Sequence, residues 1–212
     1  MSRTNGRSIF VDMARVTQEH LDARRQQILD ASRRCFIRNG FHTTSMQDIL
    51  SEANLSSGAL YRYFRSKEEI IVAIAQDVLA QVAHGIESAL EPDVPLSADA
   101  IFSRLFLTIE RIDAEQDIAR MAVQVWGEAL RSPVVAEQVR VSVGQTLQIL
   151  AARIRIYQEL GSISSGVAPE HMARAVVSVL PGFILQRALL GDIDAATFGS
   201  AFSALLSTEP TA

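Results

Sequence analysis

The segment Thr44–Lys67, with the sequence TSMQDILSEANLSSGALYRYFRSK, decides the fold of this chain. Thr44 and Gln47 have the spacing of a capping box, in which each of two side chains accepts a hydrogen bond from the other residue's backbone amide. Apolar residues then recur at intervals of three and four, and Asn54 tolerates the left-handed conformation that ends many helices. The sequence therefore predicts a short helix whose buried face holds Met46, Ile49, Leu50 and Ala53.

A second short helix is predicted after the turn at residues 54–56, capped by Ser57 or by the serine before it. Leu60 and Phe64 are four residues apart and should both face the core. Gly58 lies in the first turn, where glycine costs about 1 kcal/mol relative to alanine. A requirement other than helix stability therefore favours a bare backbone at Gly58, and close approach to a phosphate is one such requirement.

The other sides of this second helix carry Tyr61, Arg62 and Tyr63. Two tyrosines and an arginine on an exposed helix are poor core residues and suitable contacts for phosphates and base edges. A third helix should start directly afterwards, capped by Ser66. Lys67, the only lysine in the chain, would lie in its first turn, where the helix dipole disfavours a cation and a phosphate partner would offset this. This arrangement describes a DNA-binding helix-turn-helix.

The residues of this motif resemble the DNA-binding domain of the TetR/AcrR family of one-component transcriptional regulators. The resemblance spans residues 24–70 and is carried by Gly40-Phe41, Thr44-Ser45-Met46-Gln47-Asp48-Ile49, Ala53, Ser57-Gly58-Ala59-Leu60-Tyr61-Arg62-Tyr63-Phe64 and Ser66-Lys67-Glu68-Glu69-Ile70. It implies an all-α fold, in which an N-terminal three-helix helix-turn-helix domain precedes a C-terminal helical ligand-binding and dimerisation domain. It also implies a homodimer that binds double-stranded DNA at an inverted-repeat operator and responds to a small-molecule effector.

Carried over residue by residue, the resemblance places DNA contacts along the whole motif. Tyr61 and Lys67 would bind phosphates, whereas Ser57 and Arg62 would read bases. This chain departs from many relatives at Arg62-Tyr63, where those proteins have another aromatic residue and a histidine, so the operator sequence stays open. The full set of implied contacts is Thr44, Gln47, Ser57, Gly58, Tyr61, Arg62, Tyr63 and Lys67.

The charge distribution agrees with a nucleic-acid partner at one end of the chain. The 212 residues have a net charge of −4, but residues 1–67 contain eleven Arg or Lys and six Asp or Glu, a balance of +5. Residues 68–212 hold the remaining nine basic and eighteen acidic residues, a balance of −9. Only the N-terminal third should therefore attract a polyanion.

The composition predicts a cytoplasmic protein without a membrane segment. Hydrophobic residues make up 48% of the chain, which is ample for a core, and the longest nearly apolar run, Val176–Leu185, is about half of what spans a bilayer. The single cysteine, Cys35, permits no internal disulfide. No residues have the spacing of a metal site, a phosphate loop or a catalytic constellation, so we expect no metal, no cofactor and no enzymatic activity.

Helical periodicity continues along the chain, and no stretch of useful length shows the alternation of apolar and polar residues that is typical of a strand. We expect a flexible tail over residues 1–16, the helix-turn-helix domain over 17–67 and the ligand-binding and dimerisation domain over 68–207. The first helix should end at Gly40, and a few of its outward arginines should face the DNA backbone. The expected helices of the second domain cover residues 68–90, 97–114, 118–131, 133–160, 169–190 and 194–206, with a boundary at the prolines of residues 91–95.

The two long helices at residues 133–160 and 169–190 are richer in apolar residues than a monomer needs. We expect them to pair with a second subunit as a four-helix bundle while also filling part of the monomer's own core. Candidates for an apolar ligand pocket are Phe102, Phe106, Met121, Trp126, Tyr157 and Phe183, with Arg104, Gln124, Glu128 and Gln186 as possible polar anchors.

The sequence leaves the effector, the regulated genes and the choice between repression and activation open, because regulators of this kind share a scaffold and not a pocket. The alternative function is that of a helical ligand-binding protein or enzyme that has a regulator's shape but does not bind DNA. Salt-dependent binding of this protein to a palindromic DNA duplex distinguishes the DNA-binding regulator from this alternative.

Overall fold

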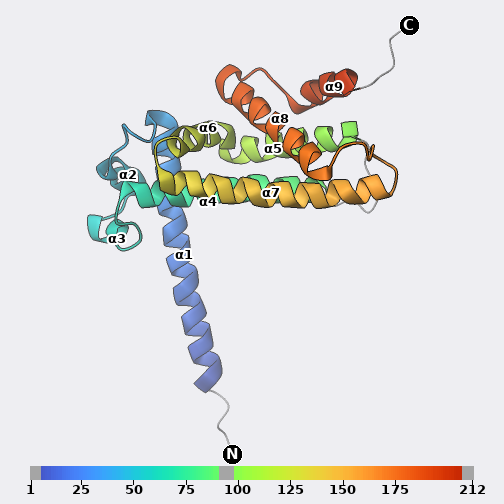
Figure 1. Ribbon diagram of the computed structural model, residues 1–212. Coiled ribbons are helices and arrows are strands. Elements are labelled where there is room, and N and C mark those ends of the chain that lie inside the picture. Colours follow the sequence, from blue (N-terminus) through green and yellow to red (C-terminus); the bar gives the residue numbers. More distant parts are fainter. Residues whose placement is uncertain (1–5, 91–97, 207–212) are drawn as a thin grey trace, which may run out of the picture. The chain divides into compact units, whose positions relative to one another are not determined.

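The computed structural model describes residues 6–90 and 98–206, and every regular element in these ranges is an α-helix (Figure 1). The predicted all-α fold is therefore confirmed. The chain divides into two compact units, one up to Ile74 and one from Ala75 onward. This division falls inside a helix, later than the predicted boundary after Lys67, because the first turns of that helix, with the buried Ile70, belong to the N-terminal unit.

The first helix, α1 (Gly6–Asn39), is longer than predicted. The expectation of a tail over residues 1–16 is wrong for residues 6–16, and residues 1–5 lie outside the described ranges. No glycine or proline interrupts the chain between Gly6 and Asn39, and a helix that has nucleated extends readily. The helix ends at Gly40, whose φ of +83° makes it the predicted terminator.

The N-cap of the next helix, α2 (Met46–Ala53), lies one residue later than predicted. The Ser45 hydroxyl accepts a hydrogen bond from the Asp48 amide at 3.2 Å, and the Asp48 carboxylate accepts one from the Ser45 amide at 2.8 Å. Thr44 cannot be the cap, because its side chain is buried and its hydroxyl donates to the Gly40 carbonyl at 2.9 Å. The capping box predicted at Thr44 and Gln47 is therefore wrong, although the helix itself is present.

The turn and the two helices that follow agree with the sequence. Asn54 adopts the left-handed conformation, with a φ of 52°, and ends α2 as predicted. The next helix, α3 (Ser57–Tyr61), has five residues, and α4 (Lys67–Ala89) starts shortly after it. The Ser66 hydroxyl accepts a hydrogen bond from the Glu69 amide at 3.2 Å, so Ser66 caps α4.

An apolar core positions these helices in the N-terminal unit. The Phe36 and Phe41 rings meet edge to face with their centroids 4.8 Å apart. Side chains from α1, α2, α3 and α4 are fully buried, among them Ile28, Leu29, Phe36, Ile49, Leu60 and Ile70. Because the inward faces of all four helices contribute, the orientation of the five-residue α3 follows from its neighbours.

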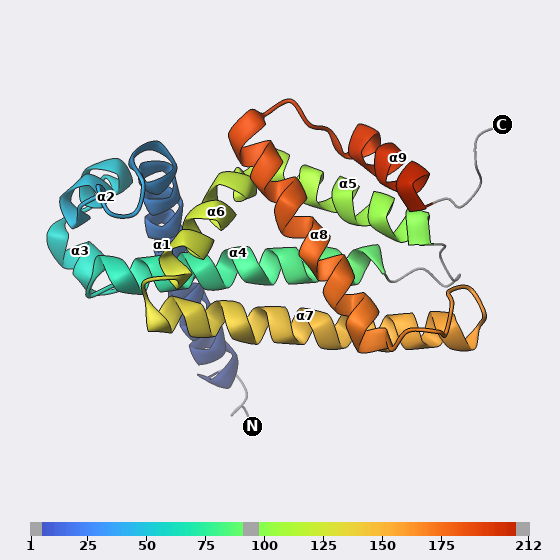
Figure 2. The same cartoon turned by 45° about the horizontal axis from the view of Figure 1, so that its top comes forward.

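The C-terminal unit contains the rest of α4 and, within the described residues, five further helices. Their bounds agree with the predicted ones to within two residues: α5 (Ala98–Gln116), α6 (Ile118–Ala129), α7 (Pro133–Glu159), α8 (Pro169–Leu190) and α9 (Ala195–Leu206). Figure 2 shows α8 crossing α7 and α9 lying along α5. Ser132 caps α7 as its hydroxyl accepts from the Val135 amide, and Pro133 opens the helix. The predicted proline boundary at residues 91–95 lies outside the described residues.

Five phenylalanines join α5, α8 and α9. The fully buried Phe106 ring of α5 lies 5.0 Å from Phe183 of α8 and 4.7 Å from Phe198 of α9, measured between centroids. Phe102 and Phe202 extend the cluster, with their centroids 4.4 Å apart. Aromatic side chains bury more apolar surface than any others, so this cluster holds the last helix against the bundle.

An ion network links the same three helices. Arg187 of α8 donates from Nε to the Asp113 carboxylate at 2.9 Å and from Nη1 to the Glu110 carboxylate at 2.7 Å. Glu110 also accepts from the Ala195 amide at the start of α9. The Arg187 and Asp113 side chains are only 17% and 13% exposed, so removal of the cation would leave poorly hydrated carboxylates.

We expect Arg187→Met to lower the free energy of unfolding of the C-terminal unit by about 3 kcal/mol, because two carboxylates lose their cation in a partly buried site. Arg155→Met is the control, since Arg155 pairs with Glu170 where both side chains are more than half exposed, and it should cost at most about 1 kcal/mol. Urea unfolding followed by the fluorescence of Trp126, the only tryptophan, measures both. Equal losses would contradict a special role for the network.

Candidate functional site

The α3 segment separates buried from exposed side chains as the sequence predicts. Leu60 and Phe64 are 0% and 4% exposed and face the core. The predicted contact residues are accessible, with Ser57, Gly58, Tyr61 and Arg62 exposed and Tyr63 half-buried. The helix ends at Tyr61, so Arg62 and Tyr63 follow it in a turn instead of extending it.

A polar hollow of about 410 Å³ lies at the joint between α2 and α3. Gln47 of α2 and Ser57 of α3, two predicted contact residues that are ten positions apart in the sequence, both line this hollow. Their neighbours in it are Leu50, Ser51, Asn54, Leu55 and Ser56. The fold therefore brings a predicted residue from each helix to one accessible surface rich in hydroxyl and amide groups.

Gly58 has no role inside the molecule that only glycine could fill. A Cβ atom added at this position would meet no atom within 4 Å, and its φ does not lie in the left-handed region. Alanine would therefore fit the fold and favour the helix. The missing side chain leaves room for something outside the chain to approach the backbone.

Lys67 and Thr44 hold the motif together from within. The Lys67 ammonium donates to the Thr44 carbonyl at 2.9 Å and to the His42 carbonyl at 3.1 Å. These carbonyl oxygens offset the unfavourable dipole at the start of α4, a role that the sequence had led us to expect for a phosphate. An ammonium has three N–H donors, so one of them is not used by these two bonds. The buried Thr44 side chain, by contrast, is not available for a contact with DNA.

The arginines of α1 have partners within the N-terminal unit. Arg34 and Arg38 pair with Glu52 of α2 at 2.7 and 3.2 Å, and these hydrogen bonds hold the pKa of the Glu52 carboxyl below its usual value. The Arg25 guanidinium lies 5.4 Å from the centroid of the Phe64 ring. The expectation that α1 arginines face the DNA backbone therefore has no support for these three. The exposed Arg62, by contrast, forms no ion pair or side-chain hydrogen bond with any described residue.

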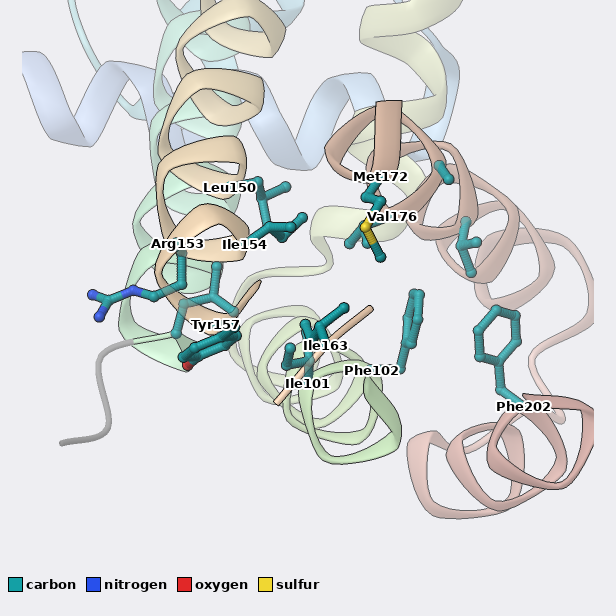
Figure 3. A pocket seen from close by; sticks show the side chains of 13 residues that line it. Ile101, Phe102, Leu150, Arg153, Ile154, Tyr157, Ile163, Met172, Val176 and Phe202 are labelled. Carbon is teal, nitrogen blue, oxygen red and sulfur yellow. The ribbon is translucent and has the colours of Figure 1, made fainter. Parts of the chain in front are cut away.

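The C-terminal unit has an apolar cavity of about 300 Å³ lined by residues of α5, α7, α8 and α9 (Figure 3). Two of the predicted pocket residues, Phe102 and Tyr157, line it. The other lining residues are Leu90, Ile101, Leu150, Arg153, Ile154, Ile163, Met172, Ala175, Val176, Val179 and Phe202. Several of these lie on α7 and α8, the two helices that the sequence predicts to form the dimer, because periodicity alone cannot show which partner a helix face has.

The remaining predicted pocket residues lie elsewhere. Phe106 and Phe183 belong to the aromatic core, Met121 is buried in α6, and Trp126 lines a second, smaller cavity of about 80 Å³. The four suggested polar anchors do not line the larger cavity: Arg104, Gln124, Glu128 and Gln186. Arg153 of α7 is among the lining residues, but its guanidinium points away from the cavity in Figure 3, so it takes no anchor's place there. No three His, Cys, Asp or Glu side chains lie close enough to hold a metal ion in the part of the chain that is described.

Comparisons with known proteins agree with this geometry. The family model for bacterial regulatory proteins of the tetR family matches residues 28–74, and the C-terminal model of BetI-type transcriptional repressors matches residues 105–209. The HTH-type transcriptional regulator UidR of Escherichia coli K12 is 29% identical over 181 residues, which are 81% of this chain and 82% of that protein.

Solved structures show the same similarity. GusR of Salmonella enterica superposes with a TM-score of 0.70 at 29% identity, covering 87% of this chain and 95% of that one. FadR of Bacillus subtilis, solved in complex with stearoyl-CoA, has a TM-score of 0.71 and covers 88% of this chain and 99% of its own. Its identity of 16% shows a likeness in fold alone.

We expect Lys67→Met to destabilise the N-terminal unit by about 1 to 2 kcal/mol, because it removes two hydrogen bonds from a charged donor. Arg65→Met is the matched control, since Arg65 is an exposed cation two positions away without a side-chain partner among the described residues, and it should change stability by at most about 0.5 kcal/mol. Hydrogen exchange of the amides in residues 46–61 measures the difference. Identical protection in both variants would show that the carbonyl contacts contribute nothing.

Proposed function

This chain belongs to the tetR family of bacterial regulatory proteins, and from this premise we propose that it is a homodimeric repressor that a small molecule releases from an inverted-repeat DNA operator. The observation that carries the proposal is the pairing of two features in one chain. One is an exposed, polar and cationic surface around α3 in the N-terminal unit, and the other is an apolar cavity in the C-terminal unit. We assign no catalytic role and place the protein in the cytoplasm, where its operator would be.

On DNA, α3 enters the major groove and the joint between α2 and α3 faces the backbone. Ser57 and Arg62 read base edges, while Gln47, Tyr61 and Tyr63 bind phosphates or sugars. Lys67 contributes its remaining N–H to a phosphate, in addition to its two internal hydrogen bonds. Gly58 lets the backbone approach closely. The balance of +5 over residues 1–67 supplies the attraction that does not depend on sequence.

The apolar surface of α8 supports a homodimer. Both α4 and α8 are long and apolar enough for a membrane span by composition, but 44% of the relevant window is buried in α4 and only 22% in α8. Leu189 and Leu190 are 70% and 64% exposed, and Val141 of the neighbouring α7 is 47% exposed. A soluble regulator is expected to cover such a surface, and pairing α7 and α8 with the same helices of a second subunit does so symmetrically.

Release by a ligand requires that the DNA-bound and ligand-bound arrangements differ. Helix α4 starts at Lys67 in the N-terminal unit and continues through the unit boundary after Ile74. Leu90, which directly follows α4, lines the apolar cavity. A ligand that shifts α4 would therefore move the two recognition helices out of register with successive grooves. A typical coupling of about 1 to 3 kcal/mol would weaken operator binding by about 5- to 150-fold.

We expect Gly58→Ala to stabilise the protein by about 0.5 to 1 kcal/mol and to weaken operator binding by about tenfold or more, because the added Cβ fits the fold but obstructs the close approach to DNA. Gly127→Ala is the control, since Gly127 also lies in a helix with nothing within 4 Å of an added Cβ, and it should give the stability gain alone. Thermal unfolding and titration of duplexes selected from a random pool measure the two quantities.

The selection also tests the proposal as a whole. Selected duplexes should contain an inverted repeat with half-sites about 34 to 36 Å apart, and their retention should fall steeply with salt. Failure to select any such repeat would favour the alternative of a ligand-binding protein without an operator. If Gly58→Ala binds as tightly as Gly127→Ala, Gly58 is not at the DNA surface.

We expect Leu189→Glu to convert the dimer to a monomer at micromolar concentration and to abolish tight operator binding, because a charge would be buried at the centre of an apolar contact. Leu205→Glu is the control, since Leu205 is 82% exposed on α9 and should tolerate the charge. Sedimentation measures the mass of both variants. A dimeric Leu189→Glu variant, or a monomeric protein that binds the operator with full affinity, would rule out this interface.

A further inference from the structure

We propose that the apolar cavity of the C-terminal unit takes an uncharged, hydrocarbon-like molecule that forms no hydrogen bond with the protein. This inference names the class of effector and therefore rests on the proposed function. It excludes organic acids, amines and sugars as occupants of the cavity. Three features support it: the chemistry of the cavity wall, the pairing of the backbone amides around it, and its volume.

The wall of the cavity presents almost only carbon. Among the 13 described residues that line it, Arg153 and Tyr157 alone carry side-chain nitrogen or oxygen atoms. Figure 3 shows the Arg153 guanidinium pointing away from the cavity, so this residue contributes its aliphatic part to the wall. The Tyr157 hydroxyl is buried and does not reach the cavity surface, so Tyr157 contributes its ring. The lining side chains therefore offer a ligand no hydrogen bond.

The backbone amides around the cavity are engaged as well. Most lining residues lie within helices, where each amide donates to the carbonyl of the preceding turn. Leu90 and Ile163 lie outside the helices, and their amides donate to the carbonyls of Glu87 at 3.0 Å and Tyr157 at 3.3 Å. A ligand with an acceptor group therefore finds no free amide at the two lining positions where the helical pattern is interrupted.

A charged ligand would lose its hydration in this cavity without compensation. An ammonium group would find no carboxylate, because no Asp or Glu is among the described lining residues. A carboxylate would find no donor, since the only lining cation points elsewhere. Transfer of an ion or of an unpaired hydroxyl into such surroundings is unfavourable, whereas transfer of a hydrocarbon is favourable. The wall therefore selects for an apolar molecule.

The volume limits the size of this molecule. The cavity measures about 300 Å³, which is about twice the volume of an apolar protein cavity that binds benzene. A bicyclic or branched skeleton of about ten to twelve carbon atoms is of the corresponding size. The lining runs from the buried Leu150 and Ile154 to the half-buried Val176 and the exposed Ala175 of α8, so a small molecule can enter from the α8 side.

A second copy of the chain does not account for this cavity. The exposed leucines of the proposed dimer surface, Leu189 and Leu190, lie at the end of α8, whereas the lining residues Met172 and Val176 lie in its first half. The two apolar surfaces of α8 are therefore separated along the helix, and the cavity is left for a small molecule.

The test measures binding of four probes to the full-length protein by calorimetry, in the absence of DNA. Methylnaphthalene, naphthylmethanol, naphthoate and naphthylmethylammonium share one carbon skeleton and differ only in the group attached to it. Methylnaphthalene should bind tightest, naphthylmethanol more weakly by about tenfold or more, and the two ions more weakly still. Binding of an ion as tight as that of methylnaphthalene, or no binding of methylnaphthalene up to its solubility limit, would overturn the proposal.

Met172→Gln tests whether the missing hydrogen bond is the cause of this preference. Met172 lines the cavity, and glutamine has a similar size and helix propensity but adds an amide. The preference for methylnaphthalene over naphthylmethanol should fall by about fivefold or more, because the hydroxyl gains a partner. Met46→Gln is the control, since Met46 is equally half-buried but lies in α2, and it should leave the preference unchanged. An unchanged preference in both variants would contradict the proposal.

Val176→Phe tests the place of binding. The larger side chain would occupy part of the cavity and should weaken methylnaphthalene binding by about tenfold or more, while the unfolding midpoint shows that the variant is folded. Val134→Phe is the control, since Val134 is 51% exposed on α7 and does not line the cavity. Equal binding by the two folded variants would show that the probe binds elsewhere.

Operator binding is measured separately, so that two failures can be told apart. If methylnaphthalene binds in the cavity with the expected preference but leaves operator affinity unchanged, the ligand class stands and release by this ligand does not. If an ion binds in the cavity and releases the operator, while methylnaphthalene does neither, the proposed function stands and the apolar ligand class is wrong.

Discussion

Two hydrogen bonds from the Lys67 ammonium add to the apolar core that positions the helices of the N-terminal unit. They join the first turn of α4 to the carbonyls of His42 and Thr44, which are 25 and 23 residues earlier in the chain and lie in the loop that enters α2. Because α3 has only five residues, it cannot hold its own position and depends on the helices on either side of it. The Lys67 cation lies at a helix end where the dipole is unfavourable. The two carbonyls offset this by accepting its hydrogen bonds, and in the proposed complex a phosphate does so as well.

The same residue stands at the start of the helix that both units share. Helix α4 has 23 residues, and the division between the units falls after Ile74, so its first turns belong to the α2 and α3 core and the rest to the C-terminal bundle. A continuous hydrogen-bonded helix transmits a change of direction better than a loop would, because its backbone dihedrals are fixed. In the proposed mechanism the ligand acts on the DNA-binding surface through this helix. The size of the effect depends on how much more tightly the ligand binds the protein with α4 in one direction than in the other.

The helices α7 and α8 show how one apolar sequence pattern serves three purposes. Leu180 and Phe183 fill the core of the monomer, and Ile154 and Val176 line the cavity. Leu189 is left exposed and forms part of the proposed dimer surface. This division explains why both helices are richer in apolar residues than a single buried face requires, and why their hydrophobic periodicity is weak as a guide to any one partner.

The sequence by itself determined the helices, because capping residues, glycine terminators and intervals of three and four are local and act within a few residues. Ser66, Ser132 and Gly40 behave as their positions predict. The exposed set around Tyr61 followed from the same local pattern, once Leu60 and Phe64 were assigned to the core.

Contacts between distant residues were decided by the tertiary structure alone. The burial of Thr44 moves the cap of α2 by one residue, and the Lys67 ammonium donates to two carbonyls where the sequence had suggested a phosphate alone. Arg153 lies among the residues that line a cavity between four helices. The physical reason is that a helical pattern states which face is apolar but not what covers it. Packing against the rest of the chain makes that choice.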